Sequence, residues 1–186
     1  MTLTERKTAA RKAAFARRKE AFATKMPGQA ALLSELLAGH RGVPLAGFMP
    51  IQTEISPLAA MAEAAAYGPV GVPVIQAAGQ PLTFAKWEPG CPMVEGAFKA
   101  QIPERVIEMV PEVVIVPLVA FDLDGGRLGY GGGFYDRTLE GLRARQATLA
   151  IGFAFDAQQA QDLPLEVTDQ PLDIIVTETR VIECKR

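Results

Sequence analysis

The sequence has few of the residues that cross-link chains, ligate metals or span membranes. Its 186 residues include two cysteines and one histidine, which excludes a disulfide-stapled mini-protein and a His/Cys metal cluster. No apolar run approaches the roughly 18 residues of a membrane helix, and the N-terminal segment lacks the apolar core of a secretory signal. Lys and Arg total 19 against 21 Asp and Glu, so the net charge of −2 favours neither nucleic acid nor an anionic membrane as a partner. We therefore expect a cytoplasmic protein with both cysteines as thiols.

What the sequence does contain is a 49% apolar fraction together with 17 glycines and 14 prolines. A chain of this length forms one domain or at most two small ones. No linker, internal repeat or low-complexity tract divides it, so we expect a single domain over residues 1–186. The high apolar fraction and small net charge argue against disorder.

Helix-forming and β-branched segments alternate along the chain. Helices are expected over residues 4–25, 29–37, 58–67 and 136–145, the third with Ser56 as its N-cap and Pro57 in its first turn. Buried strands are expected over residues 44–49, 71–75, 113–121, 148–154 and 172–177. Residues 81–87 suit an antiparallel edge strand or hairpin, and residues 88–112 read as irregular. This order predicts an α/β fold with a mainly parallel β-sheet covered by helices on both faces.

The most informative segment is FDLDGGRLGYGGGFYDR, residues 121–137, which runs from a predicted buried strand into a predicted helix. Ligands of open α/β sheets bind at such strand ends. Its glycines let backbone N–H groups converge on an anion, and the helix N-terminus favours the same anion. Arg127 can donate to phosphate, and Asp136 can hold a divalent cation. The spacing fits neither G-x-G-x-x-G nor the P-loop, yet the parts together predict a nucleoside triphosphate site.

Basic residues form a stripe along the first predicted helix. Lys7, Arg11, Arg18 and Lys25 recur at spacings of four and seven, so they share one helical face. That face could bind phosphate or could simply be solvated. Lys12, Arg17 and Lys19 lie on the same helix outside this stripe, and we expect them to be solvated rather than functional. We expect the same of Arg18, although it belongs to the stripe.

The glycine-rich segment resembles that of the 5-formyltetrahydrofolate cyclo-ligase family, also called methenyltetrahydrofolate synthetases. The resemblance rests first on RLGYGGGFYDR at residues 127–137, preceded by PLVAFD at 117–122. Weaker matches are KxxxR at 7–11, FMPIQTE at 48–54, LTFAKW at 82–87 and TDQPLDIIVTE at 168–178. Thr168 stands where the family usually has His, and Phe134 where Tyr is usual. Gly132 replaces a Lys of some members, so the first helix is expected to supply more of the positive charge.

The resemblance implies a ligase of one-carbon metabolism that uses ATP and Mg²⁺. It would convert 5-formyltetrahydrofolate into 5,10-methenyltetrahydrofolate, releasing ADP and phosphate, by phosphorylation of the formyl oxygen and ring closure by N10. The implied ATP-binding residues are Lys7, Arg11, Arg127, Leu128, Gly129, Tyr130, Gly131, Gly132, Gly133, Phe134 and Tyr135. The implied folate-binding residues are Met49, Glu54, Trp87, Phe134 and Tyr135. The implied Mg²⁺ ligands are Asp136 and Asp173. We expect a monomer without membrane or nucleic-acid partners.

Several of these residues have an alternative interpretation. Trp87 could pack in the core or an edge strand, Asp173 could cap a strand end, and Glu54 could be an exposed loop acid. The sole histidine, His40, suits a surface turn, and no Ser-His or Cys-His pair is in view for hydrolysis. The protein could also use ATP on another formamide or carboxylate. A third possibility is a folate- or nucleotide-binding regulatory module without turnover, with RNA contact through the first helix.

Overall fold

An eight-stranded mixed β-sheet forms the centre of the molecule in the computed structural model, which describes residues 1–185. In spatial order the strands are β12 (Val181–Glu183), β11 (Ile174–Val176), β10 (Leu149–Phe153), β7 (Val113–Pro117), β1 (Leu45–Ala46), β2 (Val70–Val74), β3 (Thr83–Lys86) and β6 (Glu108–Met109). The five strands from β11 to β2 pair in parallel, whereas β12, β3 and β6 are antiparallel to their neighbours at the two edges. The predicted mainly parallel α/β sheet is confirmed.

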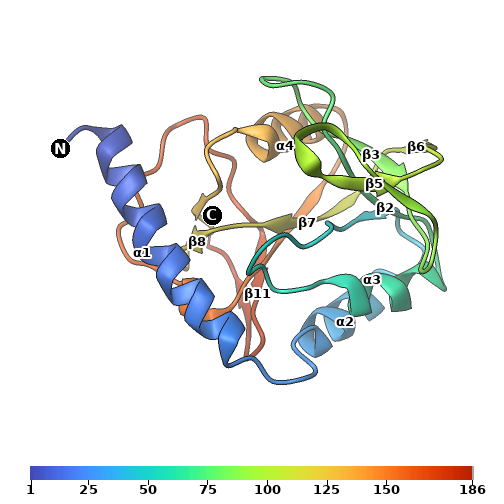
Figure 1. The fold of residues 1–186 in the computed structure, drawn as a ribbon, viewed down its shortest axis with the longest axis horizontal. Coiled ribbons are helices and arrows are strands. Elements are labelled where there is room, and N and C mark those ends of the chain that lie inside the picture. The colour runs from blue at the N-terminus through green and yellow to red at the C-terminus, as the bar shows by residue number, and fades with distance from the viewer. Residues whose placement is uncertain (186) are drawn as a thin grey trace.

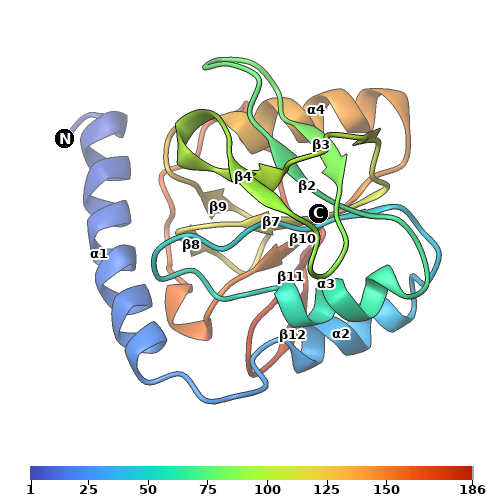
Figure 2. The ribbon, with the colours of Figure 1, turned by 45° about the vertical axis from the view of Figure 1, so that its right-hand side comes forward.

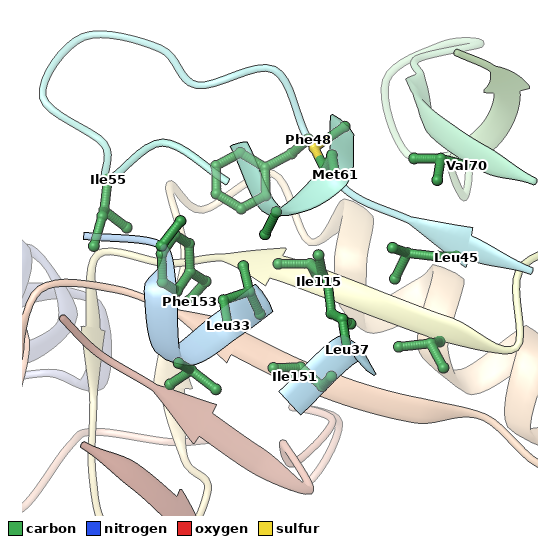
Figure 3. Close-up of a cluster of buried hydrophobic side chains, with 14 of the residues drawn as sticks. Leu33, Leu37, Leu45, Phe48, Ile55, Met61, Val70, Ile115, Ile151 and Phe153 are labelled. Carbon is green, nitrogen blue, oxygen red and sulfur yellow. The ribbon is translucent and has the colours of Figure 1, made fainter. Parts of the chain in front are cut away.

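Helices cover both faces of this sheet. The helices α2 (Ala31–Ala38) and α3 (Leu58–Ala65) lie on one face, and α4 (Phe134–Arg145) lies on the other (Figure 2). Successive side chains of β7 point to opposite faces. Val113 and Ile115 pack in the cluster under α2 and α3 that Figure 3 shows, while Val114 and Val116 pack under α4. This double burial explains why β7 reads as an uninterrupted apolar run.

Some element boundaries differ from those predicted. The strand expected over residues 113–121 ends at Pro117, which has no N–H to continue the ladder. Two more residues of that run form β8 (Ala120–Phe121), which pairs with β9 (Arg127–Leu128) in a separate hairpin. The segment expected to be irregular contains β6 and the hairpin of β4 (Met93–Glu95) and β5 (Gln101–Pro103). Ser56 is not the N-cap of α3, because Pro57 holds that position.

The first helix, α1 (Leu3–Ala23), stands beside the sheet rather than on one of its faces (Figure 1). Its start is fixed by a capping box between Thr2 and Glu5. It packs through a small cluster centred on Ala14, with Val119, Ala120 and Leu128 of the β8–β9 hairpin region. Among residues 1–185, no helix combines the length and apolarity needed to cross a membrane.

The strands β1 and β7 are parallel neighbours in the sheet, and the connections that follow them run toward opposite edges of the sheet. After β1 the chain passes through α3 to β2 on one side, and after β7 it passes through α4 to β10 on the other side. Two connections that leave adjacent parallel strands in opposite directions open a crevice at the carboxyl ends of those strands. The segments that follow β1 and β7 contain Glu54 and the glycine-rich loop, so the topology brings them together.

Candidate functional site

A cavity of about 480 Å³ lies at this crevice. Its volume falls within the range of small-molecule sites. Residues from α1, from the segments after β1 and β7, and from residues 166–169 all contribute to its wall. The predicted site residues that line it are Lys7, Arg11, Met49, Glu54, Arg127, Leu128, Gly129, Tyr130, Gly131, Gly132, Gly133, Phe134, Tyr135 and Asp136.

The glycine-rich loop forms one side of the cavity and leads directly into α4. Gly131 has a φ of 103° and Gly133 a φ of 66°, and residues other than glycine rarely adopt such backbone conformations. Gly133 is the N-cap of α4 and supplies no side chain to the first N–H groups of the helix. A Cβ atom there would lie 2.7 Å from Nη1 of Arg137. The loop thus presents backbone and a helix N-terminus to the cavity, an arrangement suited to an anion.

Arg127 and Asp136 form a direct ion pair in the cavity wall. Nη2 of Arg127 lies 2.6 Å from Oδ1 of Asp136, which also accepts a hydrogen bond from the backbone N–H of Gln170 at 2.8 Å. Arg127 is only 6% exposed, and burial lowers its pKa, although Asp136 and Asp169 act in the opposite direction. Its buried Nε has no hydrogen-bond partner among the described residues. The pair holds a guanidinium at the cavity with donor capacity left for a ligand.

Two cations of α1 reach the same side of the cavity. Nε of Arg11 donates to the carbonyl oxygen of Gly129 at 2.8 Å, which ties the helix to the glycine-rich loop. Nζ of Lys7 lies 2.8 Å from Oε2 of Glu166 and 3.4 Å from Oδ2 of Asp169. Burial lowers the pKa of Lys7, but these two carboxylates outweigh it and raise the pKa overall. Lys7 is therefore cationic at neutral pH at the cavity wall.

Glu54 also lines the cavity and is almost fully buried. Its Oε2 accepts the backbone N–H of Ile51 at 2.8 Å, and its Oε1 accepts the hydroxyl of Tyr130 at 2.9 Å. Burial raises the pKa of Glu54, while those two hydrogen bonds and the charge of Arg18 lower it. The alternative interpretation of Glu54 as an exposed loop acid is wrong. A buried carboxylate with a perturbed pKa in a cavity is a typical binding group.

The remainder of the wall is largely apolar. Phe134 and Tyr135 open α4 beside the side chains that end β1, β2 and β7. The buried hydroxyl of Tyr135 has no hydrogen-bond partner within residues 1–185, and burial raises its pKa. The other apolar residues of the wall are Phe48, Met49, Ile51, Pro73, Ile75, Leu82 and Pro117. Such a wall suits a flat aromatic ligand.

Two predicted site residues lie elsewhere. Trp87 is 8% exposed and packs in the apolar cluster under α2 and α3 rather than along the cavity, in agreement with the alternative of a core role. Asp173 does not line the cavity either. Its Oδ2 accepts the backbone N–H of Ala150 at 2.8 Å and lies 3.1 Å from Nη2 of Arg143. These contacts agree with the alternative that it caps a strand end.

Three features of the site were not predicted. Arg18, expected to be solvated, is fully buried and bonded to Tyr130. Its place on the helical face of Lys7 and Arg11 was the available signal. Arg137 is the last residue of the RLGYGGGFYDR segment and was given no role, yet it lines the cavity, and its Nη2 donates to the carbonyl oxygen of Gly132 at 2.6 Å. Glu166 and Asp169 line it too; Asp169 lies in the TDQPLDIIVTE match, but neither residue was assigned a role in the site.

The acidic residues of the cavity determine whether it could bind a metal ion by itself or only together with a phosphate ligand. No group of three or more His, Cys, Asp or Glu side chains within the described part of the chain is placed to enclose a metal ion. Asp136 and Asp169 nevertheless both line the cavity close to Arg127. Mg²⁺ is commonly held by one or two carboxylates together with substrate phosphates. This donor set fits a magnesium–nucleotide complex better than a resident metal.

Comparison with known proteins identifies the family. The sequence profile of the 5-formyltetrahydrofolate cyclo-ligase family matches residues 4–178. A 5-formyltetrahydrofolate cyclo-ligase of Mycolicibacterium smegmatis is 31% identical over 173 residues, which cover 86% of this chain and 87% of that protein. The Escherichia coli K12 protein of that name is 41% identical over 107 residues, covering 55% of this chain. This chain spans only 58% of the length of that E. coli relative.

Solved structures agree with this assignment. The NMR structure of Aquifex aeolicus 5,10-methenyltetrahydrofolate synthetase superimposes with a TM-score of 0.74 and 25% identity, covering 97% of this chain and 93% of the other. A 5,10-methenyltetrahydrofolate synthetase from Mycoplasma pneumoniae has the same fold, with a TM-score of 0.66 and 22% identity over 92% of this chain and 98% of the other. The glycine-rich loop, the buried acid and the profile match over almost the whole chain lead to one conclusion: the chain belongs to the 5-formyltetrahydrofolate cyclo-ligase family.

Proposed function

We propose that the protein converts 5-formyltetrahydrofolate into 5,10-methenyltetrahydrofolate, using ATP and Mg²⁺ and releasing ADP and phosphate. One observation carries the proposal. The lining of a single cavity combines a glycine-rich loop and Arg127 with a buried carboxylate, Glu54, and apolar neighbours. The loop suits a triphosphate, and the carboxylate with its apolar neighbours suits a flat ring that presents N–H donors.

The triphosphate would lie along the glycine-rich loop. Backbone N–H groups of residues 129–133 and the N-terminus of α4 would donate to its oxygens. Arg127 would add a guanidinium, while Lys7 and Arg11 would cover the phosphates from α1. Lys7 would then exchange some of its contact with Glu166 and Asp169 for phosphate. These contacts would place positive charge beside the phosphates and hold the γ-phosphate in position. Positioning and charge stabilisation are most of what a protein contributes to phosphoryl transfer.

Mg²⁺ would be held by Asp136 together with phosphate oxygens of ATP. Oδ1 of Asp136 already accepts hydrogen bonds from Arg127 and Gln170, which fix the carboxylate at the end of the loop. The cation would neutralise the negative charge of the phosphates. Asp169 is the better candidate for a second carboxylate, because it lines the cavity and Asp173 does not.

The folate would place its pterin ring against the apolar wall. Glu54 would accept hydrogen bonds from pterin N–H groups, and Met49, Phe134 and Tyr135 would pack around the ring system. An ionised carboxylate has about four lone-pair sites, of which Ile51 and Tyr130 use two. Each oxygen of Glu54 therefore keeps capacity for one donor of the substrate.

The cavity would then bring the formyl oxygen to the γ-phosphate. In the first step this oxygen attacks the γ-phosphorus and ADP departs, which turns a poor leaving group into a good one. In the second step the N10 lone pair attacks the formyl carbon, the C–O bond breaks and phosphate leaves as N10 loses its proton. The residues of this chain would hold the two reactants in contact, which lowers the entropic cost of the reaction. They would also stabilise the charge that develops on the phosphoryl group.

A direct assay tests the proposal. Purified protein is mixed with 5-formyltetrahydrofolate, ATP and Mg²⁺, and the absorbance of the methenyl product is followed. We expect product only when all three are present, with one ADP formed per product. Absence of ATP-dependent product would refute the proposal. Saturable folate binding without product would instead support a regulatory module, and ADP release with another formamide or carboxylate would support a different substrate.

A further inference from the structure

One charged side chain of α1 has no place in the roles assigned so far. Arg18 is fully buried, although arginine is among the residues least often found inside proteins. Its Nε donates to the hydroxyl of Thr53 at 3.0 Å, and its Nη1 donates to the hydroxyl of Tyr130 at 2.7 Å. Its guanidinium lies 4.9 Å from the ring centre of Phe15 and 5.5 Å from that of Tyr130. The side chain is thus held from several directions.

The contacts of Arg18 lead to the buried acid of the cavity. Tyr130 accepts the bond from Arg18 and donates its own hydroxyl proton to Oε1 of Glu54 at 2.9 Å. Thr53, the second partner of Arg18, directly precedes Glu54 in the chain. Arg18 therefore fixes Glu54 twice, through the side chain of Tyr130 and through the backbone at Thr53.

We propose that Arg18 and Tyr130 are positioning residues that hold the Glu54 carboxylate oriented and ionised for recognition of the pterin ring. The proposal rests on the function proposed above, in which Glu54 accepts pterin N–H groups. Arg18 does not touch the cavity itself and acts through Tyr130 and Thr53. Because Tyr130 belongs to the glycine-rich loop, the same hydroxyl also ties the folate side of the cavity to the phosphate side.

The electrostatic surroundings of Glu54 are consistent with this role. Burial raises the pKa of Glu54, and a protonated carboxyl would accept fewer hydrogen bonds from the ring. The groups that face it are Arg18 from α1, Tyr130 from the loop and Tyr135 from α4. Arg18 is the only cation among them, and its charge lowers the pKa of Glu54. Removal of that charge must therefore move the protonation of Glu54 to higher pH.

The test separates charge, hydrogen bonding and simple structural support. In Arg18→Met we expect the KM for 5-formyltetrahydrofolate to rise about tenfold, with kcat and the KM for ATP within about twofold. The acid limb of the kcat/KM profile for folate should move to higher pH. Tyr130→Phe should raise the same KM about fivefold. Arg18→Lys retains the charge, so it should restore the wild-type position of the acid limb even where KM stays raised.

The matched control is Arg17→Met on the same helix. Arg17 bonds to backbone oxygens of Ala157 and Gln159, away from the cavity, so its loss should leave both KM values unchanged. If Arg18→Met and Tyr130→Phe both behave like this control, or raise the two KM values equally, the proposal is overturned. Should Arg18→Met fail to fold by circular dichroism, Tyr130→Phe decides alone.

Calorimetric titration with 5-formyltetrahydrofolate in the absence of ATP keeps the two proposals separate. Weaker binding by the Arg18 and Tyr130 variants than by Arg17→Met would support the positioning role even if the wild-type protein gave no turnover. In that case only the proposed reaction would fall. Equal binding by all the variants, alongside normal wild-type turnover, would refute the positioning role and leave the reaction standing.

Discussion

Arg127 and Arg18 are both buried beside the cavity, and each is connected to an acid in a different way. Arg127 contacts Asp136 directly at 2.6 Å. Arg18 is connected to Glu54 only through the hydroxyl of Tyr130. In the first case the two charges neutralise each other at short range. In the second, a neutral group stands between them, so both ions keep more of the cost of burial.

This difference corresponds to two different tasks. A carboxylate in direct contact with a guanidinium is held in a fixed orientation, as a metal and phosphate site requires. A carboxylate whose nearest cation is one group away stays available to donors from a ligand. Burial dominates the pKa of both groups: it lowers the pKa of Arg127 despite Asp136, and it raises the pKa of Glu54 despite Arg18. Removal of either acid should therefore affect stability differently.

The largest effect is expected from Asp136→Asn. Loss of the carboxylate leaves the buried guanidinium of Arg127 without its counter-ion, which typically costs about 3–5 kcal/mol. Turnover should fall about a hundredfold or more, since the proposed Mg²⁺ ligand is lost as well. Urea unfolding measures the first effect, and the absorbance assay at saturating ATP measures the second. Full activity in this variant would place the metal ligand elsewhere.

Glu54→Gln should show the other side of the comparison. We expect stability at pH 7 within about 1 kcal/mol of the wild type, together with weakened folate binding. The pKa of Glu54 is raised on folding, so its contribution to stability is present at low pH and is lost as pH rises through the folded value. The wild type should gain stability relative to Glu54→Gln when the pH is lowered. A relative loss on acidification would contradict the raised pKa.

Asp173→Asn tests whether an ion pair with an arginine is enough to identify an aspartate as a Mg²⁺ ligand. Asp173 pairs with Arg143 at 3.1 Å but lies outside the cavity. We expect a stability loss of about 1 kcal/mol and turnover within about threefold of the wild type, with an unchanged dependence on Mg²⁺ concentration. Titration of activity with MgCl₂ decides the matter. A large increase in the Mg²⁺ requirement would restore Asp173 as a metal ligand.

The smallest effect on activity is expected from Trp87→Phe, because this side chain belongs to neither of the two arginine–acid connections. Trp87 packs under α2 and α3, so the variant should lose about 1–2 kcal/mol of stability through reduced packing. The KM for 5-formyltetrahydrofolate should stay within about twofold of the wild-type value. A tenfold rise in that KM, with unchanged stability, would show that the tryptophan contacts the folate.

How much the sequence could reveal depended on whether a signal was local. The apolar run at 113–121 and the helical pattern at 136–145 are local, and both elements form, although the strand ends at Pro117 and the helix begins at Phe134. The glycine-rich loop is also local, because a backbone that approaches an anion needs those residues in succession. Short strands such as β4 and β6 carry too few residues to show alternation, so they were missed.

Contacts between distant segments were harder to predict. Asp169 and Asp173 stand four residues apart in one stretch, and nothing in the sequence indicates which carboxylate faces the cavity. The structure separates them through the bond of Asp169 to Glu166 N–H and the bond of Asp173 to Ala150 N–H. The burial of Arg18 likewise depends on Tyr130, more than a hundred residues away. Helical periodicity fixes the face of a side chain but not what covers that face.

The attachment of α1 has a consequence for how activity could be lost. This helix carries Lys7, Arg11 and Arg18, yet within its length only Ala14 and Arg18 are buried. A peripheral element with little buried apolar surface opens at a lower free energy than the sheet it rests on. Its amides should therefore exchange with solvent hydrogen earlier than those of β7, and bound nucleotide or folate should slow that exchange selectively. Ligand binding and the docking of α1 are therefore linked equilibria, so a change that loosens the helix weakens the ligand, and a bound ligand holds the helix in place.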